Sequence, residues 1–582
     1  MPDTNSAIAE NKSATTPNQA ATNAPASQTD VYAITGADPE VLAYAMAKYS
    51  RSSLSMKESL AEISSQRAEQ FLNTFYFQYG HRSIADLAHI PFAIERLSLL
   101  AAIALVDEQR WDGQERSTRY QNFRKSGWYT PALPPEQTTA YTASVEALFA
   151  AYDKVGADML VALKASIPRP DAMDEAAYTR TLKARAFDVA RYLLPLATNT
   201  SLGQIVSART LESQISRLLT SEFAEVRALG DRLKTAAASP AWNVNRESAR
   251  VLLEEAASFS IPNATGREDF HARLSDALVH DVKTAPTLVK YASPSDYTIA
   301  SRAELRGAAA ELMSGQPIEP APVVDLVEDA GSLEVELATS LLYPECHYSW
   351  RQLQRTVAAL PAPRVAELIA LGAKHRGRHD ELPRTFSAGQ TFKFDILMDI
   401  GGFRDMHRHR RCVQLLQDYT DLHGYEEPIC PGQPTLAEAG LHETYTAAMT
   451  AAHAAYRTAL SSSNAPLSSS GSAPLLSSGS APLLSSRTLS EQRESKGEGS
   501  ASPSPNPDAA YLLPLGTRIR AMFKMDFAEA LYIAELRSGV AGHFSYRRVA
   551  WEMYLAVAKR HPALAPYFRI EDVNQPIDLL KR

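Results

Sequence analysis

The chain has 582 residues, too many for one ordinary domain core, and it carries 59 Lys and Arg against 66 Asp and Glu. The resulting net charge of −7 gives no overall attraction to nucleic acid or to an anionic membrane surface, and no apolar stretch approaches the roughly 20 residues that span a bilayer. Three cysteines without CxxC spacing are too few for a disulfide framework, so we expect a reducing, cytoplasmic location.

The N-terminal part begins with residues 1–30, which lack the basic start and apolar core of a signal peptide and predict a disordered tail. Between residues 39 and 77, apolar residues recur at three-to-four spacing, as in amphipathic helices. Ser83, three residues before Asp86, resembles a capping box, so we expect a second helix to begin there.

The next segments alternate between apolar and charged character. Residues 89–106 predict a strand followed by an Ala/Leu-rich helix, and the charged run at 107–120 is typical of a solvated loop or helix end. Residues 140–237 have helical periodicity, which weakens from 239 to 323 because seven prolines interrupt it.

An internal repeat organises the chain. Residues 81–120 begin with His and end with Tyr, a spacing of 120 − 81 = 39, and residues 379–419 repeat this pattern with a spacing of 419 − 379 = 40. The segment LPLAT at 194–198 returns as LPLGT at 513–517. These echoes predict a tandem duplication.

We therefore divide the chain into a first copy at 31–319, including a linker, and a second copy at 320–582. In the second copy, alternating apolar residues at 392–396 suggest a strand, and 526–561 has a helical pattern. Residues 461–507 are rich in Ser, Pro and Gly and predict a disordered surface insertion.

Four motifs of the first copy resemble flavin-dependent thymidylate synthase in order and spacing: GHRS at 80–83, QERSTRY at 114–120, LPLAT at 194–198 and AEVR at 224–227. The resemblance implies an α+β fold in each copy, with many helices and a small antiparallel sheet. It covers most of the first copy.

The family signature, RHRxxSxNExSxRY, is split between the two copies. The first copy keeps the second half, but Asp107, Glu108 and Gln109 occupy the RHR positions. The second copy, MHRHRRCVQLLQDY at 406–419, keeps a basic cluster and lacks ExSxR.

The register of that basic cluster is open at the level of sequence. Counting back from Tyr419 places His407 and Arg408 at the HR positions. Matching RHR literally selects Arg408, His409 and Arg410 and displaces the tyrosine by two residues.

The resemblance also implies roles for individual residues. It assigns flavin binding to His81, Ser83, Asp86, Glu115, Arg209, Arg217 and His407. It assigns nucleotide binding to Ser117, Arg119, Arg227, Arg520 and Arg547. The residues that it implies in catalysis are Arg408, His409, Arg410, Ser117, Arg119 and Tyr120.

The implied reaction passes a methylene group from methylenetetrahydrofolate to C5 of dUMP, with FAD reduced by NADPH and with neither a metal nor a cysteine nucleophile. Because each copy keeps what the other has lost, we expect a composite site in which Arg408, His409 and Arg410 face Ser117, Arg119 and Tyr120. We also expect a homo-oligomer, a dimer of two-copy chains, that binds neither nucleic acid nor membranes.

Three other interpretations remain open. The chain could be a non-catalytic flavin- or nucleotide-binding protein whose signature has decayed. His375, His379 and Asp380, with the histidines of the basic cluster, could form the metal site of an HD-type phosphohydrolase. The Pro-Glu-Cys-His segment at 344–347 is reminiscent of the nucleophile of cysteine-dependent thymidylate synthase, but no other motif of that family occurs and a buried structural cysteine is the favoured explanation.

Overall fold

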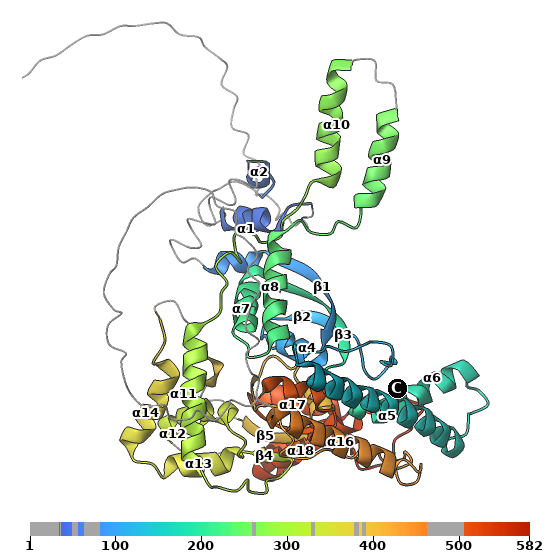
Figure 1. Cartoon of the computed structure of the whole chain (residues 1–582), viewed down its shortest axis with the longest axis vertical. Coiled ribbons are helices and arrows are strands. Elements are labelled where there is room, and N and C mark those ends of the chain that lie inside the picture. The colour runs from blue at the N-terminus through green and yellow to red at the C-terminus, as the bar shows by residue number, and fades with distance from the viewer. Residues whose placement is uncertain are drawn as a thin grey trace, which may run out of the picture.

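A computed structural model describes residues 34, 36–48, 56–62, 82–258, 264–327, 332–377, 383–386, 392–461 and 506–581 (Figure 1). The predicted N-terminal tail and nearly all of the predicted insertion at 461–507 lie outside these residues. Of the helices predicted between residues 39 and 77, two segments are described.

The elements of the first half of the chain are α1 (Pro39–Lys48), α2 (Met56–Glu62), η2 (Arg82–Leu87), β1 (His89–Ser98), α4 (Leu99–Val106), β2 (Asp112–Glu115), α5 (Pro135–Ser166), α6 (Glu175–Ala190), η3 (Arg191–Leu193), β3 (Asn199–Ser207), α7 (Ala208–Leu219), α8 (Ala224–Ala238), α9 (Arg246–Ser258), α10 (Ala264–Val279) and α11 (Asp296–Leu312).

Those of the second half are β4 (Val324–Leu326), α12 (Leu333–Leu342), η4 (Tyr343–Glu345), α13 (Trp350–Ala358), α14 (Ala362–Ala373), η5 (Arg384–Phe386), β5 (Phe392–Asp399), α15 (Ile400–Met406), β6 (Val413–Leu416), α16 (His442–Ser461), η6 (Pro507–Leu512), β7 (Arg518–Met525), α17 (Phe527–Ser538), α18 (Phe544–Arg560) and η7 (Pro562–Tyr567).

Each copy contains one small antiparallel sheet, as expected. The strand order is β1-β3-β2 in the first sheet and β4-β5-β7-β6 in the second. The predicted strand-to-helix passage at 89–106 is confirmed as β1 and α4, and the strand predicted at 392–396 lies in β5. Three details differ: the charged run contains β2, the strands β3 and β7 were not predicted, and the helix expected near Ser83 is the 3₁₀ helix η2.

The two copies meet through their repeated Leu-Pro-Leu segments. The Leu196 N–H donates to the Leu513 carbonyl, and the Leu515 N–H donates to the Leu194 carbonyl, both at 2.9 Å. Each bond maps onto the other when positions are shifted by 513 − 194 = 319. Such reciprocal contacts are the mark of a twofold interface, so the copies are related by a pseudo-twofold axis within one chain.

The N-terminal caps of α4 and α15 occupy equivalent positions in the two copies, but the capping residue and its partner have exchanged a hydroxyl for a carboxylate. Ser98 caps α4 by accepting from the Ala101 N–H, and its own hydroxyl donates to Glu225 at 2.6 Å. In the second copy Asp399 caps α15, and Ser545 donates to it. Carboxylate and hydroxyl have changed places while the cap was kept, because either oxygen satisfies a helix N-terminus.

One continuous hydrophobic core includes residues of both copies, and α5 of the first copy packs against its counterpart α16. A second cluster of buried hydrophobic residues is formed mainly by α11–α14. The pair α9 and α10 projects from the body of the molecule (Figure 1). No helix among the described residues has the length and apolar character needed to cross a membrane.

Candidate functional site

Strand pairing decides the register of the basic cluster. Asp112 of β2 pairs with Ile205 of β3, and Val413 of β6 pairs with Lys524 of β7. Ile205 and Lys524 are equivalent by the Leu-Pro-Leu offset (524 − 205 = 319), so Asp112 corresponds to Val413, an offset of 413 − 112 = 301. The literal RHR register is therefore the structural one, and the sequence match of Tyr120 with Tyr419 is wrong by two residues.

At this offset the segment Asp107-Glu108-Gln109 of the first copy corresponds to Arg408, His409 and Arg410. Both segments follow a short helix, α4 or α15, and precede the edge strand β2 or β6. The pseudo-twofold axis brings these two loops together.

A cavity of about 660 Å³ lies between the two loops. The first copy lines it with residues 109–112 and 205–207, together with Asp86, and the second copy lines it with residues 408–411 and α17. Five arginines and three carboxylates border it, so its charge at neutral pH is positive and suits an anionic ligand. Tyr532 and Leu536 of α17 are each about half exposed here.

Arg410 of this cavity has side-chain donors without a protein acceptor. Its Nη1 donates to the Arg408 carbonyl at 3.0 Å, whereas Nε and Nη2 are buried without a hydrogen-bond partner in the described structure. Burial and the neighbouring Arg408 lower the pKa of Arg410. A buried donor without an acceptor is unfavourable, so these two N–H groups indicate a place for ligand oxygens.

His409 is held on both ring nitrogens. Arg537 Nε donates to His409 Nε2 at 2.7 Å, and Nδ1 lies 3.5 Å from the Glu529 carboxylate. Burial lowers the pKa of His409, so the ring is neutral, with its proton on the side of Glu529. In the first copy Glu108 and Arg217 repeat this contact at 2.9 Å.

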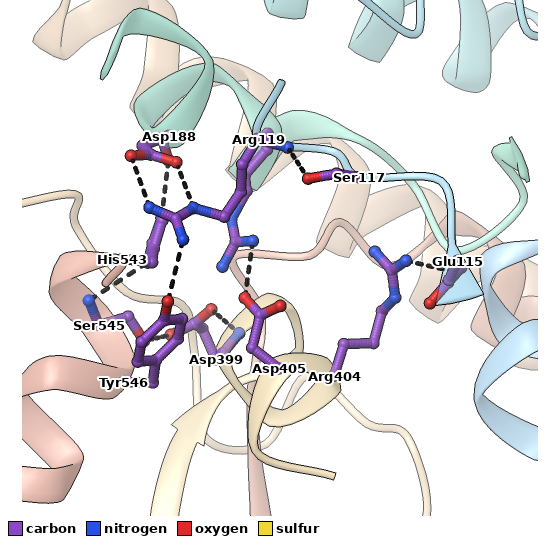
Figure 2. Close-up of polar contacts among 12 residues, drawn as sticks. Glu115, Ser117, Arg119, Asp188, Asp399, Arg404, Asp405, His543, Ser545 and Tyr546 are labelled. Atoms are coloured by element: carbon purple, nitrogen blue, oxygen red, sulfur yellow. Dashed lines mark hydrogen bonds and ion pairs between the residues drawn. The ribbon is translucent and has the colours of Figure 1, made fainter. Parts of the chain in front are cut away.

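Further polar contacts join the copies beside the cavity. His407 Nε2 lies 3.5 Å from Asp107, and Arg404 of α15 forms an ion pair with Glu115 of β2 (Figure 2). The predicted flavin contacts Glu115 and His407 thus lie in the contact between the copies.

Arg119 lies in a buried network rather than in the cavity. Its guanidinium donates to both carboxylate oxygens of Asp188, at 2.8 and 3.2 Å, and to the Tyr546 hydroxyl at 2.9 Å (Figure 2). Burial disfavours its charge, but Asp188 outweighs burial and the pKa of Arg119 is raised. Nearby, Arg191 pairs with Asp405 at 3.0 Å across the copies.

The expected juxtaposition of the basic cluster with Ser117, Arg119 and Tyr120 is not found within the described chain. Ser117 accepts a hydrogen bond from the Arg119 N–H at 3.2 Å, and Tyr120 is 56% exposed beside a separate cavity of about 580 Å³. The twofold axis brings the basic loop to residues 109–112 instead, upstream of the retained ExSxRY half.

The remaining predicted arginines contact protein atoms. Arg209 pairs with Asp86 at 3.2 Å, and Arg217 also donates to the Ala104 carbonyl at 2.6 Å. Arg227 donates to two carbonyls at the start of its own helix.

Two buried arginines of the second copy are also held by protein oxygens. Arg520 donates to Asp395 at 3.0 Å, and Arg547 donates to the Ser538 carbonyl at 2.8 Å. His81 and the side chain of Ser83 are outside the described structure, so their flavin roles stay predictions.

The two rival motifs have different outcomes. Cys346 is buried, and burial raises the pKa of its thiol to about 12, which suits a structural cysteine and not a nucleophile. His375 contacts Glu304 at 2.7 Å, whereas His379 and Asp380 are not described. Within the described residues, no group of three or more His, Cys, Asp or Glu is arranged to hold a metal.

Sequence reasoning missed most of the first-copy wall of the cavity, in particular Arg110 and Trp111. A signal was present, because an isolated tryptophan beside a glycine in a run of charged residues is unusual for a solvated loop. The charged composition masked it.

The fold and the cavity define a two-copy α+β protein with an arginine-lined cavity between the copies. The chain belongs to the thymidylate synthase complementing protein family, whose model matches residues 31–239 and 383–563. One matched region falls in each predicted copy, and the resemblance inferred from the motifs is confirmed.

Relatives include a UPF0159 protein of Chlamydia pneumoniae, 25% identical over 94% of this chain and 93% of its own length. A flavin-dependent thymidylate synthase of Clostridium tetani is 25% identical over 30% of this chain and 67% of its own. A solved flavin-dependent thymidylate synthase from Helicobacter pylori, complexed with FAD and dUMP, is 17% identical, covers 34% of this chain and 89% of its own, and gives a TM-score of 0.22.

Proposed function

We propose that this chain is an FAD-dependent thymidylate synthase that converts dUMP to dTMP, with methylenetetrahydrofolate and NADPH as co-substrates. Family membership supports the class of reaction. The observation that carries the proposal is the pair of buried, unpartnered N–H groups of Arg410 in a cavity between the copies.

The residues of the cavity fit a flavin dinucleotide. Arg408, Arg410 and Arg411 would hold the diphosphate, because guanidinium donors match phosphate oxygens in geometry and charge. The half-exposed faces of Tyr532 and Ile205 would contact planar rings. When bound, FAD supplies the redox chemistry, and the protein supplies binding and orientation.

This proposal gives Arg119, Arg520 and Arg547 structural roles, because their guanidiniums already donate to protein oxygens. His409 becomes a neutral residue that orders the cavity wall through Glu529 and Arg537.

The first experiment is to purify the whole chain, record its visible absorbance and titrate it with FAD. We expect a yellow protein, or one that binds added FAD. In Arg410→Ala we expect FAD to bind about 10 to 100 times more weakly, since a hydrogen bond to a charged group contributes about 1.5–3 kcal/mol. Arg246→Ala, which removes an exposed arginine paired with Asp281, is the matched control and should bind FAD like the wild type. A wild-type protein that fails to bind FAD refutes the proposal.

A second function, flavin binding without catalysis, is favoured by one observation: Asp107, Glu108 and Gln109 replace the RHR of the first copy. The separating experiment incubates the FAD-loaded chain with dUMP, methylenetetrahydrofolate and NADPH and measures dTMP. We expect dTMP to form. Bound FAD with no dTMP would support the binding protein.

A further inference from the structure

We propose that Trp111 of the first copy is a positioning residue that orients Arg410 of the second copy toward a phosphate group of the ligand. The inference rests on the proposed function, since it concerns the same cavity. It adds a residue at a variable position of the family signature to the binding machinery.

The contact between the two side chains is direct. Arg410 Cζ lies 4.5 Å from the centroid of the Trp111 ring, which is the geometry of a cation–π interaction. Since Nε and Nη2 of Arg410 make no hydrogen bond in the described structure, the indole face replaces a carboxylate as the neighbour of this guanidinium. The charge is held in place while two of its nitrogens are left without a protein acceptor.

The indole is itself fixed by a chain of buried hydrogen bonds. Trp111 Nε1 donates to Gln204 of β3 at 2.7 Å, Gln204 donates to Gln214 of α7 at 3.0 Å, and Gln214 donates to the Leu105 carbonyl at 2.9 Å. Both glutamines are almost fully buried. Because every polar group in this chain has a partner, the ring orientation is well defined.

Gly113 makes room for this arrangement. A Cβ atom built at Gly113 would lie 2.4 Å from Trp111 and 2.4 Å from the Gly203 carbonyl oxygen. Any larger residue at position 113 would therefore displace the indole from β2, and Arg410 would lose its contact with the Trp111 ring. The segment Trp111-Asp112-Gly113 thus works as one unit.

The contact between Trp111 and Arg410 occurs on one side of the pseudo-twofold axis. At the offset of 301, the positions of Arg410, Trp111 and Gly113 correspond to Gln109, Cys412 and Gln414. Gln109 carries no charge, and the thiol of Cys412 is buried against the His409 carbonyl. Each chain therefore holds one such phosphate position, not two.

The test compares Trp111→Phe with Trp111→Leu in the full-length chain, with FAD and inorganic pyrophosphate as probes in equilibrium titrations. Both substitutions remove the hydrogen bond to Gln204, so both should lower the melting temperature by a similar amount. They differ in the aromatic face. We expect Trp111→Leu to weaken binding of both probes about tenfold and Trp111→Phe by less than about threefold, as a cation–π contribution of about 0.5–2 kcal/mol requires.

Equal binding constants in the Phe and Leu variants would overturn the inference. If Trp111→Leu folds poorly, Gly113→Ala is the second variant. It retains Trp111 but displaces the indole from its position beside Arg410, so it should give the same loss of affinity. In an Arg410→Ala background, Trp111→Leu should have no further effect, because Trp111 acts through Arg410. An additional loss there would also refute the positioning role.

The two proposals fail in different ways. If pyrophosphate binds in a Trp111-dependent manner while FAD does not bind, the flavin proposal is refuted and the positioning role stands. If FAD binds equally well to the Phe and Leu variants, the positioning role is refuted and the flavin proposal stands. If neither probe binds the wild type, both proposals are refuted.

Discussion

Replacing Arg119 should destabilise the fold, although sequence resemblance makes it a site residue. Arg119 is 7% exposed and joins Asp188 of its own copy to Tyr546 and the Ala541 carbonyl of the other. Arg119→Ala removes four hydrogen bonds, two of them to Asp188, while Asp188 stays buried. The change therefore acts on the contact between the copies.

The magnitude follows from burial. Removing one partner of a buried, bidentate ion pair costs about 3–5 kcal/mol, which is a large part of a typical unfolding free energy of about 5–15 kcal/mol. The control is Arg124→Ala, because Arg124 pairs with Asp153 at the surface and is 68% exposed. An exposed pair contributes at most about 1 kcal/mol.

Urea denaturation followed by circular dichroism measures both variants. Arg119→Ala should move the midpoint strongly to lower urea, Arg124→Ala hardly at all, and the double variant Arg119→Met with Asp188→Leu should recover much of the loss, since no buried charge is left behind. A wild-type midpoint for Arg119→Ala, combined with loss of dTMP formation, would show that the residue serves the ligand and that the structural assignment is wrong.

Three further predictions concern other parts of the chain. Lys524 is fully buried, and burial lowers its pKa to about 8 despite the nearby Glu336 carboxylate. Between about pH 8 and the usual lysine pKa of 10.5, the unfolded chain therefore binds more protons than the folded chain. The stability of the wild type should rise with pH across that window. Lys524→Met should raise the unfolding free energy at pH 7 by about 1–3 kcal/mol and abolish that rise, with Lys393 still pairing Glu336 at 3.3 Å; an unchanged pH profile would contradict this. Replacing residues 462–505 by two glycines should leave the melting temperature and FAD binding unchanged, because the Asn506 N–H already lies 3.4 Å from the Leu460 carbonyl, and loss of soluble protein would show that the segment contributes to the core. Light scattering should give the mass of a dimer of two-copy chains, and a monomer with full activity would exclude the predicted oligomer.

The parts of the fold that could be predicted are those whose residues satisfy a local rule. The strand at 89–98 and the helix after it alternate and then cluster their apolar residues, and β5 does the same. β7 was missed because it buries Arg520 and Lys524, whose partners come from distant elements. The residues of β7 do alternate, but charged residues on a strand usually face solvent, so the burial of both faces of this strand could not be read from the sequence.

The register of the RHR segment shows a different limit. Two alignments that differ by two residues are equally plausible from sequence similarity alone, since each keeps a histidine next to an arginine. Hydrogen bonding of β6 to β7 selects between them by pairing Val413 with Lys524. A slip of two residues would leave each side chain on its original face, so the alternation of the strand alone does not distinguish the two alignments. The partner of the basic loop depends on the pseudo-twofold axis, which no local pattern reports.

The fusion of two copies into one chain explains why the signature could split. In a symmetric dimer each contact occurs twice, so a loop near the axis meets an identical loop and like charges oppose each other. Here each contact occurs once: Asp107 meets His407, Glu115 meets Arg404, and Trp111 meets Arg410. One loop became acidic and aromatic while the other kept its arginines, and the two now complement each other across the cavity. The segment Asp107-Glu108-Gln109 is on this view a partner of the basic cluster, and its replacement by Arg-His-Arg should separate the copies by charge repulsion rather than restore a second site.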